Sequence, residues 1–377
     1  MSESERLIIG AMSGTSADGV DVALVSVSGR GPEMKARLLA RHHRAYDPLL
    51  RRAILDLRSA GVAALPNIAW IHREVSVFHA AAVNELLLST DVTPERVAAV
   101  AAHGQTVYHD PPDTLQWLDP ALIAAETGCA VVSDFRRADC AAGGQGAPLV
   151  PFADYCLFRH PEKNRVVVNI GGIANVTHLP AGGGLERLIA FDTGPGNCIS
   201  DYLSRQYDPD GPGWDENGAR AAQGVPVYPL LNLMLARPYF GQPPPKSTDG
   251  PVMVKLFTDC LSELGRRYPP ENLLRTACLV TADTILQAVR QWVSPFPDEL
   301  IISGGGTQNA TLMGLLRQPL DRTPLIGSDE LGVPSQAKEA MAFALLGAAT
   351  LDGVAANVPS ATGARRAVVL GSVTAKP

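Results

Sequence analysis

The hydrophobic pattern of the chain alternates between two kinds of segment. Short apolar runs rich in valine, isoleucine and alanine predict buried strands. They lie at residues 7–11, 20–27, 97–102, 129–135, 165–179 (two strands), 188–192 and 300–306, where the last strand runs into a glycine turn. Between them, apolar side chains at helical spacing predict helices at 48–58, 68–88, 119–128, 198–206, 273–291 and 334–351. The alternation predicts an α/β fold.

Two stretches share one pattern of strand, small-residue turn and strand. They read LIIGAMSGTSADGVDVALV at 7–25 and VVVNIGGIANVTHL at 166–179. Each would open one half of the chain, and a twofold repeat with a nucleotide between the halves is the layout of actin, the sugar kinases and their chaperone relatives. The 377 residues correspond to about two domains. We expect one domain at 1–130 with 341–377, and the other at 131–340.

The loop SGTSADG at 13–19 is longer than a hairpin needs. A tight hairpin favours two residues, whereas a loop of Gly, Ser and Thr exposes successive backbone N–H groups that can hold a phosphate. A long turn without a ligand is the alternative. Gly171 and Gly172 would form a second phosphate loop. Gly304, Gly305 and Gly306 end a strand before a helix that Asn309 would cap, which suits a nucleotide or simply tight packing.

Several polar residues stand where a strand ends. Asp192 ends the strand LIAFD, where a rigid carboxylate could act as a general base; a turn or helix-cap aspartate is the alternative. His103, Gln105 and Thr106 follow the strand at 97–102 and would face a cleft. Asp134 and Arg136 close the strand at 129–135, with an ordinary surface ion pair as the alternative.

Composition excludes several classes of protein. The net charge of −6 argues against nucleic acid as the main partner. None of the six cysteines forms a CxxC pair, so we expect buried thiols rather than zinc or disulfide frameworks. The charged N-terminus and the absence of a long apolar run predict a cytoplasmic protein without a signal peptide or membrane span. No GxxxxGK[ST] motif is present. The proline- and glycine-rich residues 206–252 predict an ordered functional loop, with a linker as the alternative. Lys246 in this segment either approaches phosphates or is exposed.

Nine motifs in fixed order carry a family resemblance. They are GAMSGTSADGVDVAL, AAHGQTVYHDPP, SDFRRADCAAGGQGAPLVP, NIGGIANVT, FDTGPGN, RPYFGQPPPKSTDG, SGGGTQN, KEAMAFALL and NVPSATGA, from residue 10 to residue 364. With them the chain resembles the anhydro-N-acetylmuramic acid kinases, members of the actin-like sugar kinase superfamily. The resemblance implies two actin-like (ribonuclease H-like) domains around a nucleotide cleft, and a homodimer.

The resemblance also implies the reaction, which is ATP- and Mg²⁺-dependent conversion of 1,6-anhydro-N-acetylmuramic acid to N-acetylmuramic acid 6-phosphate in peptidoglycan recycling. Asp192 would activate the water that opens the anhydro bridge. Arg136, or alternatively Arg137, would pair with the lactyl carboxylate of the sugar. Asp18 would reach Mg²⁺ through water. Glu339 would be a second polar contact to the sugar or only a solvated helix carboxylate.

The remaining implied contacts fall into two sets. The nucleotide would be held by Ser13, Gly14, Thr15, Ser16, Asp18, Gly19, Gly171, Gly172, Gly304, Gly305, Gly306 and Asn309. The sugar would be held by His103, Gln105, Thr106, Asp134, Arg136, Asn175 and Glu339. Two other functions stay open: a hexokinase-like kinase in which Asp192 deprotonates a sugar hydroxyl, and a non-enzymatic actin-like ATP-binding protein.

Overall fold

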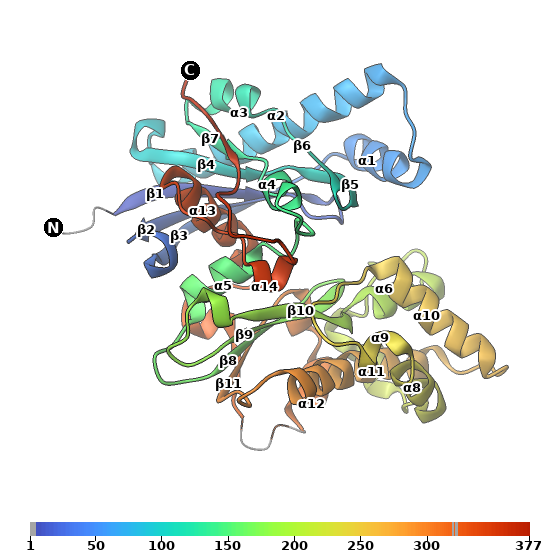
Figure 1. The fold of residues 1–377 in the computed structure, drawn as a ribbon. Helices are drawn as coiled ribbons and strands as arrows, with labels where there is room; N and C mark the ends of the chain where they lie inside the picture. The colour runs from blue at the N-terminus through green and yellow to red at the C-terminus, as the bar shows by residue number, and fades with distance from the viewer. Residues whose placement is uncertain (1–4, 319, 321–322) are drawn as a thin grey trace. The chain divides into compact units, whose positions relative to one another are not determined.

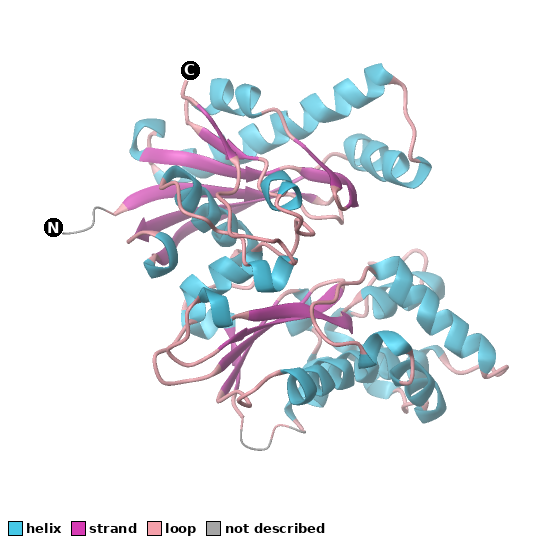
Figure 2. Cartoon of the chain, in the orientation of Figure 1, coloured by secondary structure: helices cyan, strands magenta, loops and turns pink. Residues whose placement is uncertain are grey.

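The chain divides into two compact units, residues 1–157 with 332–377 and residues 158–331 (Figure 1). The computed structural model describes residues 5–318, 320 and 323–377, so the first four residues of the charged N-terminus considered above lie outside the described residues. Each unit has its own β-sheet with helices packed beside it (Figure 2), which confirms the α/β class. In the described stretches, no helix is long and apolar enough to cross a membrane.

The first unit is built on a six-stranded sheet in the order β13-β7-β4-β1-β2-β3. β1, β2 and β3 form an antiparallel meander. β4 runs parallel to β1 and β7 runs parallel to β4, whereas β13 pairs antiparallel with β7. The strands are β1 (Arg6–Met12), β2 (Gly19–Ser28), β3 (Lys35–Ala45), β4 (Val97–His103), β7 (Val131–Ser133) and β13 (Ser372–Thr374), with a separate hairpin of β5 (Gln105–Asp110) and β6 (Asp113–Trp117). The helices are η1 (Gly31–Glu33), α1 (Pro48–Ala60), α2 (Leu65–Thr90), η2 (Pro94–Arg96), α3 (Pro120–Thr127), α4 (Arg137–Ala141), α5 (Val150–Phe158), α13 (Lys338–Leu351) and α14 (Pro359–Thr362).

Helices cover both faces of this sheet. Ile9 and Ala11 of β1 share a core cluster with Val83 of α2. Gly10 points to the opposite face, because side chains alternate along a strand. There the backbone of α13 passes so close that a Cβ on Gly10 would lie 1.7 Å from the carbonyl oxygen of Ala340.

This close approach makes Gly10 a test of the packing between β1 and α13. We expect Gly10→Ala to destabilise the protein by about 3 kcal/mol, since neither backbone can move aside without disturbing the sheet. Urea unfolding followed by circular dichroism measures the change. Gly314→Ala on α12 is the control and should be neutral or stabilising, because nothing lies within 4 Å of that Cβ. Equal unfolding midpoints for Gly10→Ala and the parent would contradict the packing described.

The second unit repeats the strand order of the first. Its five-stranded sheet runs β10-β9-β8-β11-β12, the counterpart of β3-β2-β1-β4-β7, so the predicted internal repeat is confirmed as a shared topology. The strands are β8 (Arg165–Ile170), β9 (Ile173–Leu179), β10 (Ile189–Pro195), β11 (Glu299–Ser303) and β12 (Leu325–Gly327). The helices are η3 (Leu185–Arg187), α6 (Cys198–Tyr207), η4 (Glu216–Gly218), α7 (Ala219–Gln223), α8 (Tyr228–Leu235), α9 (Pro238–Gly241), α10 (Gly250–Glu263), α11 (Pro270–Trp292), η5 (Gly305–Gln308), α12 (Ala310–Arg317) and η6 (Ser328–Leu331).

The compact units do not divide at residues 130 and 340, where the sequence placed the boundaries. Residues 131–157 and 332–340 belong to the first unit. The reason is that β7 pairs with β4, and that the start of α13 packs against β1. Asp134, Arg136 and Glu339 are therefore residues of the first unit.

The proline-rich stretch 206–252 is not a single loop. It contains four helices, of which α8 and α9 begin with proline in the first turn, where its missing N–H costs no hydrogen bond. Leu230, Met234 and Phe240 belong to the hydrophobic core of the second unit. Prolines are typical of loops, but most of these start or flank helices. Five of the six cysteines are buried, and Cys198 is half-buried.

Candidate active site

The loop between β1 and β2 exposes polar groups on a tightly held backbone. Within the loop, the N–H of Ala17 donates to the carbonyl oxygen of Gly14 at 3.2 Å. The φ of Ala17 is 50°, which is left-handed. The side chains of Thr15, Ser16 and Asp18 are exposed, whereas that of Ala17 is buried. Small side chains thus leave backbone N–H groups and two hydroxyls accessible to an anion.

Two neighbours hold this loop from outside it. A Cβ on Gly19 would lie 2.4 Å from the carbonyl oxygen of Arg44, so only glycine allows β2 to start so close to β3. Arg58, in the last turn of α1, donates from Nη1 to the carbonyl oxygen of Thr15. The bond turns one loop carbonyl toward α1 and places a positive charge beside the loop.

Ser13 and Gln105 support the loop from within. The Tyr46 hydroxyl donates to Ser13 Oγ at 2.9 Å, Ser13 Oγ donates to Gln105 Oε1 at 2.8 Å, and Gln105 Nε2 donates to the carbonyl oxygen of Gly14 at 3.0 Å. Ser13 is 1% exposed and Gln105 0%. The expected direct contacts of Ser13 with nucleotide and of Gln105 with sugar are therefore revised to a supporting role. Tyr46 carried no sequence signal.

Arg136 is oriented by a neutral histidine. Its Nε donates to His103 Nε2 at 2.9 Å, and its Nη1 donates to the carbonyl oxygen of Gly146 at 2.9 Å. An accepting Nε2 places the His103 proton on Nδ1. Burial lowers the pKa of His103 well below its usual range, and the Arg136 guanidinium and His79 act in the same direction. Burial also lowers the pKa of Arg136, to about 10. Because this value is still well above neutral pH, Arg136 is the cation of this pair.

The neighbouring arginine has a different environment. Arg137 is exposed and pairs with Asp134, its Nη2 lying 2.5 Å from Oδ2. This ion pair engages Asp134 and Arg137 with each other, which favours Arg136 over Arg137 as the guanidinium available to a substrate. Thr106, the third predicted residue after β4, is half-buried at the start of the β5–β6 hairpin.

Glu339 lies in the first turn of α13 near two other carboxylates. Its side chain is exposed, but the protein atoms around it displace part of its water and raise its pKa. Lys338 and Arg136 oppose this shift, and Asp21 and Asp18 add to it. Lys338 itself pairs with Asp154 at 2.9 Å, with both side chains buried. The first unit therefore brings together acidic groups and the guanidinium of Arg136.

In the second unit, Asp192 is held by three hydrogen bonds to the segment 239–248. Its N–H donates to the carbonyl oxygen of Lys246 at 3.0 Å, and its own carbonyl oxygen accepts from the Tyr239 hydroxyl at 2.9 Å. Its Oδ2 accepts from the Thr248 N–H at 3.0 Å. Burial raises the pKa of Asp192 to about 6, against the Thr248 N–H and the Lys246 ammonium. A pKa near neutrality suits a general base.

These contacts bear on two alternatives that the sequence left open. Asp192 lies within β10, opposite Asn175 of β9, so it caps no helix. Lys246 is not free on a loop, because its Nζ donates to the carbonyl oxygen of Tyr239 at 3.1 Å and lies 4.7 Å from the centre of the Tyr239 ring. Tyr239 and Thr248 were not predicted, although the motif RPYFGQPPPKSTDG contains both.

The glycines of the second unit differ in role. A Cβ on Gly304 would lie 2.6 Å from the carbonyl oxygen of Ile170, and one on Gly306 would lie 2.3 Å from the Ile170 side chain, so both serve tight packing. The turn at Gly171 and Gly172 accepts backbone hydrogen bonds from residues 196–198 at the start of α6. A Cβ on Gly172 would meet nothing within 4 Å, so this turn is open.

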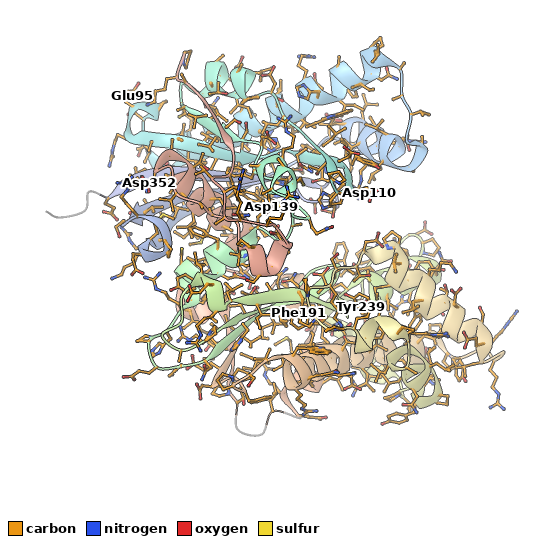
Figure 3. All side chains as sticks on the ribbon, in the orientation of Figure 1. Glu95, Asp110, Asp139, Phe191, Tyr239 and Asp352 are labelled. Carbon is orange, nitrogen blue, oxygen red and sulfur yellow. The ribbon has the colours of Figure 1, made fainter. Side chains whose placement is uncertain are left out.

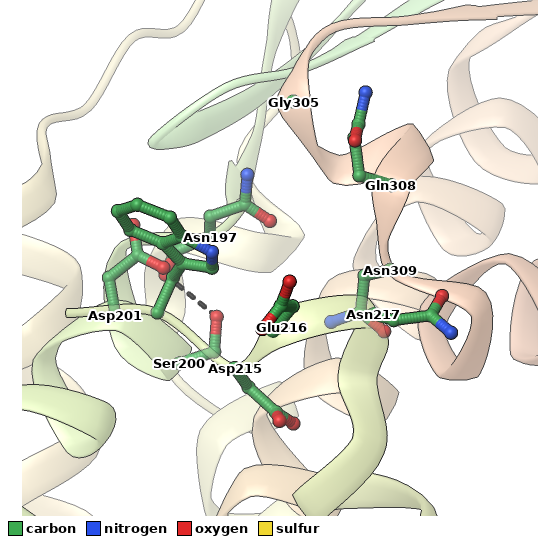
Figure 4. Close-up of a pocket in the computed structure, with 10 residues that line it drawn as sticks. Asn197, Ser200, Asp201, Asp215, Glu216, Asn217, Gly305, Gln308 and Asn309 are labelled. Atoms are coloured by element: carbon green, nitrogen blue, oxygen red, sulfur yellow. Dashed lines mark hydrogen bonds between the residues drawn. The ribbon is translucent and has the colours of Figure 1, made fainter. Parts of the chain in front are cut away.

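A polar cavity of about 660 Å³ lies in the second unit beside Gly305 (Figure 4). Asn309 lines it and caps α12 as predicted, its Oδ1 accepting from the Leu312 N–H at 3.0 Å. Burial raises the pKa of Asp201, another lining residue, to about 6. The cavity is lined by Asn197, Ser200, Asp201, Trp214, Asp215, Glu216, Asn217, Gly305, Gln308 and Asn309. Of these, the sequence singled out only Gly305 and Asn309, although Asn197 and Gln308 stand in the motifs FDTGPGN and SGGGTQN.

Comparison with known proteins decides the family. The family model described as anhydro-N-acetylmuramic acid kinase matches residues 6–376. The chain belongs to the anhydro-N-acetylmuramic acid kinase family. An anhydro-N-acetylmuramic acid kinase of Caldanaerobacter subterraneus subsp. tengcongensis is 36% identical, covering 99% of this chain and 98% of the relative. One of Bacillus cereus (strain ZK / E33L) is 39% identical, covering 98% of this chain and 99% of the relative.

Membership of the anhydro-N-acetylmuramic acid kinase family confirms that the chain is a kinase, supports its use of ATP, and places it in carbohydrate metabolism. It overturns the alternative of a non-enzymatic actin-like ATP-binding protein. Among solved structures, component A of (R)-2-hydroxyglutaryl-CoA dehydratase from Acidaminococcus fermentans shares 12% identity, covers 90% of this chain and 96% of its own, and gives a TM-score of 0.46. That likeness is too slight to carry an argument.

Proposed function

We propose that the protein opens 1,6-anhydro-N-acetylmuramic acid hydrolytically and phosphorylates its O6, with ATP as the donor. Asp192 accepts a proton from the water that attacks C1. The bond between C1 and the bridge oxygen breaks, and the freed O6 attacks the γ-phosphorus while ADP leaves. The products are N-acetylmuramic acid 6-phosphate, ADP and the proton held by Asp192. The observation that carries the proposal is the clamped carboxylate of Asp192, whose raised pKa matches the task.

One carboxylate suffices in this scheme. Hydrolysis of a glycosidic bond ordinarily uses two carboxyl groups, one to activate water and one to protonate the leaving oxygen. Here the leaving oxygen is itself the phosphoryl acceptor, so transfer to phosphorus relieves its charge. Thr248 N–H occupies Oδ2 of Asp192, and Oδ1 is the oxygen that we assign to the water.

The phosphates and Mg²⁺ are assigned to exposed groups. Gly14, Thr15 and Ser16 offer backbone N–H groups and hydroxyls, and the open turn at 171–172 offers further N–H groups. Among the described residues, no three His, Cys, Asp or Glu side chains group as a metal site. This fits Mg²⁺, which keeps several waters when it bridges phosphates, with the exposed Asp18 holding one of them. Bound Mg²⁺ would neutralise charge on the transferred group.

The nucleoside and the sugar are assigned to separate groups of residues. The cavity beside Gly305 and Asn309 has the polar lining and the aromatic side chain, Trp214, that suit a nucleoside. The guanidinium of Arg136 would pair with the lactyl carboxylate. Further sugar contacts are proposed for His103, Thr106, Asp134, Asn175 and Glu339. In the cell the enzyme would act as a cytoplasmic homodimer in peptidoglycan recycling.

The test uses oxygen from the solvent. The purified protein is mixed with Mg-ATP and 1,6-anhydro-N-acetylmuramic acid in ¹⁸O water, and the product is analysed by mass spectrometry before its anomeric centre exchanges. We expect one ¹⁸O at C1 and none after Asp192→Asn. Product without ¹⁸O, or ATP consumption only with ordinary hexoses, would leave a hexokinase-like kinase in its place.

The pKa of Asp192 predicts the pH dependence. Protonated Asp192 cannot accept a proton, so kcat/KM should fall about tenfold per pH unit below about 6. The Lys246 ammonium lowers the pKa of Asp192, so Lys246→Met should raise it and move the acid limb to higher pH. Lys255→Met is the control, since Lys255 pairs with Asp259 on the surface of α10. An acid limb that stays in place or moves to lower pH in Lys246→Met would refute the assignment.

A further inference from the structure

We propose that Asp139, Asn357 and Thr362 form a positioning triad. The triad holds the loop around Gly146, and the carbonyl oxygen of Gly146 in turn orients Arg136. The inference rests on the proposed function, because it takes Arg136 to bind the lactyl carboxylate. It gives a role to the motif NVPSATGA, at residues 357–364, to which neither the sequence nor the mechanism above assigned one.

The triad centres on a buried carboxylate. Asp139 of α4 is 0% exposed and lies inside the first unit (Figure 3). Its Oδ1 accepts from Asn357 Nδ2 and from Thr362 Oγ1, both at 2.7 Å, and its Oδ2 accepts from the Gly146 N–H at 2.8 Å. A carboxylate without these donors would be costly to bury. Three fixed donors therefore specify one conformation for this carboxylate.

Gly146 links the triad to Arg136. Its N–H donates to Asp139, and its carbonyl oxygen accepts from Arg136 Nη1 at 2.9 Å. Its φ is +65°, and a Cβ would lie 2.7 Å from the sulfur of Cys140, so glycine is needed here. A Cβ on Gly144 would lie 2.2 Å from Asp139 Oδ2. The two glycines let the loop wrap around the carboxylate.

The C-terminal segment closes on the same loop through its backbone. The Gln145 N–H donates to the carbonyl oxygen of Thr362 at 2.8 Å, and the Arg365 N–H donates to that of Ala142 at 3.0 Å. Asn357 is held in turn, since its Oδ1 accepts from the Val368 N–H at 2.7 Å. Segments more than 200 residues apart in sequence thus share one hydrogen-bond network.

The consequence concerns the direction of the guanidinium. His103 takes the Nε–H and Gly146 takes one N–H of Nη1, and two such bonds fix the plane of the group. A carboxylate bound by arginine in bidentate fashion requires that plane to be set. Loss of the triad should therefore weaken binding of the carboxylate-bearing sugar while the chemistry at Asp192 continues.

The test compares two sugars in five proteins: the parent, three single variants and one double variant. Thr362→Val removes the hydroxyl at nearly constant volume, and Thr362→Ser keeps it. For 1,6-anhydro-N-acetylmuramic acid we expect Thr362→Val to lower kcat/KM by about tenfold, chiefly through KM. The loss should be smaller for 1,6-anhydro-N-acetylglucosamine, which lacks the lactyl group. Thr362→Ser should restore the parent value. In an Arg136→Met background, Thr362→Val should change kcat/KM by less than about twofold.

The outcomes separate the two proposals. Equal losses on both sugars, or an undiminished loss in the Arg136→Met background, would overturn the triad and leave the proposed function standing. A parent protein that does not phosphorylate the anhydromuramic sugar would overturn the proposed function, and this inference with it. Thermal unfolding checks each fold. If Thr362→Val is unfolded, Asp139→Asn carries the same comparison, since its amide would oppose the Gly146 N–H while its oxygen still accepts from Asn357 and Thr362.

Discussion

Asp192→Asn is expected to lower kcat by about 10²- to 10⁴-fold, the contribution ordinarily made by a positioned general base. Asparagine keeps the shape of the side chain and can still accept from the Thr248 N–H, but it cannot take a proton from water. Product formation in single-turnover assays measures the loss. Because the substrate contacts assigned above lie on other residues, we expect KM to change little.

Thermal unfolding separates catalysis from stability, and a second carboxylate variant tests the single-carboxylate scheme. Burial raises the pKa of Asp192, which means that the ionised carboxylate is unfavourable in the folded protein at neutral pH. Asp192→Asn should therefore unfold at the same temperature as the parent or higher, as is common where a site trades stability for activity. Glu339→Gln should lose far less activity. A loss as severe as that of Asp192→Asn would show that two carboxyl groups act, and the single-carboxylate scheme would fail.

Arg136→Met is expected to raise KM for 1,6-anhydro-N-acetylmuramic acid by about 10²-fold, since a desolvated ion pair loses its cation. Removing this guanidinium also leaves His103 Nε2 and the carbonyl oxygen of Gly146 without their donor. The sugar that lacks the lactyl group separates the two effects, because only loss of the ion pair is specific to the carboxylate. Steady-state kinetics with both sugars provides the measurement.

Arg137→Met is the matched control for Arg136. Arg137 is exposed and pairs with Asp134 on the surface, so we expect its loss to change KM by less than about threefold. If Arg137→Met raised KM as much as Arg136→Met, or if Arg136→Met affected both sugars equally, the carboxylate would not be bound by Arg136.

The sequence by itself determined the class of fold and the family. Strands such as β1, β4 and β8 are buried on both faces and read as continuous apolar runs, so local pattern alone predicts them. β3 was missed, since it has exposed and half-buried residues in alternation at an edge of the sheet. The prolines of α8 and α9 looked like loop residues because a first-turn proline and a loop proline have the same local sequence.

The predicted site residues were mostly placed by motif, and their roles were decided by packing. Arg136 lies in the turn between β7 and α4, as expected, whereas Asp192 lies in the middle of β10 and not at a strand end, because the strand continues to Pro195. Only the tertiary structure shows that Gln105 is buried behind the loop, that Gly304 serves packing, and that Thr248 occupies one oxygen of Asp192. Such pairings join residues tens to hundreds of positions apart, and hydrogen-bond geometry at that separation leaves no periodic signal in a single sequence. The sequence thus determined which chemical groups are present, and the fold decided which of them remain free to react.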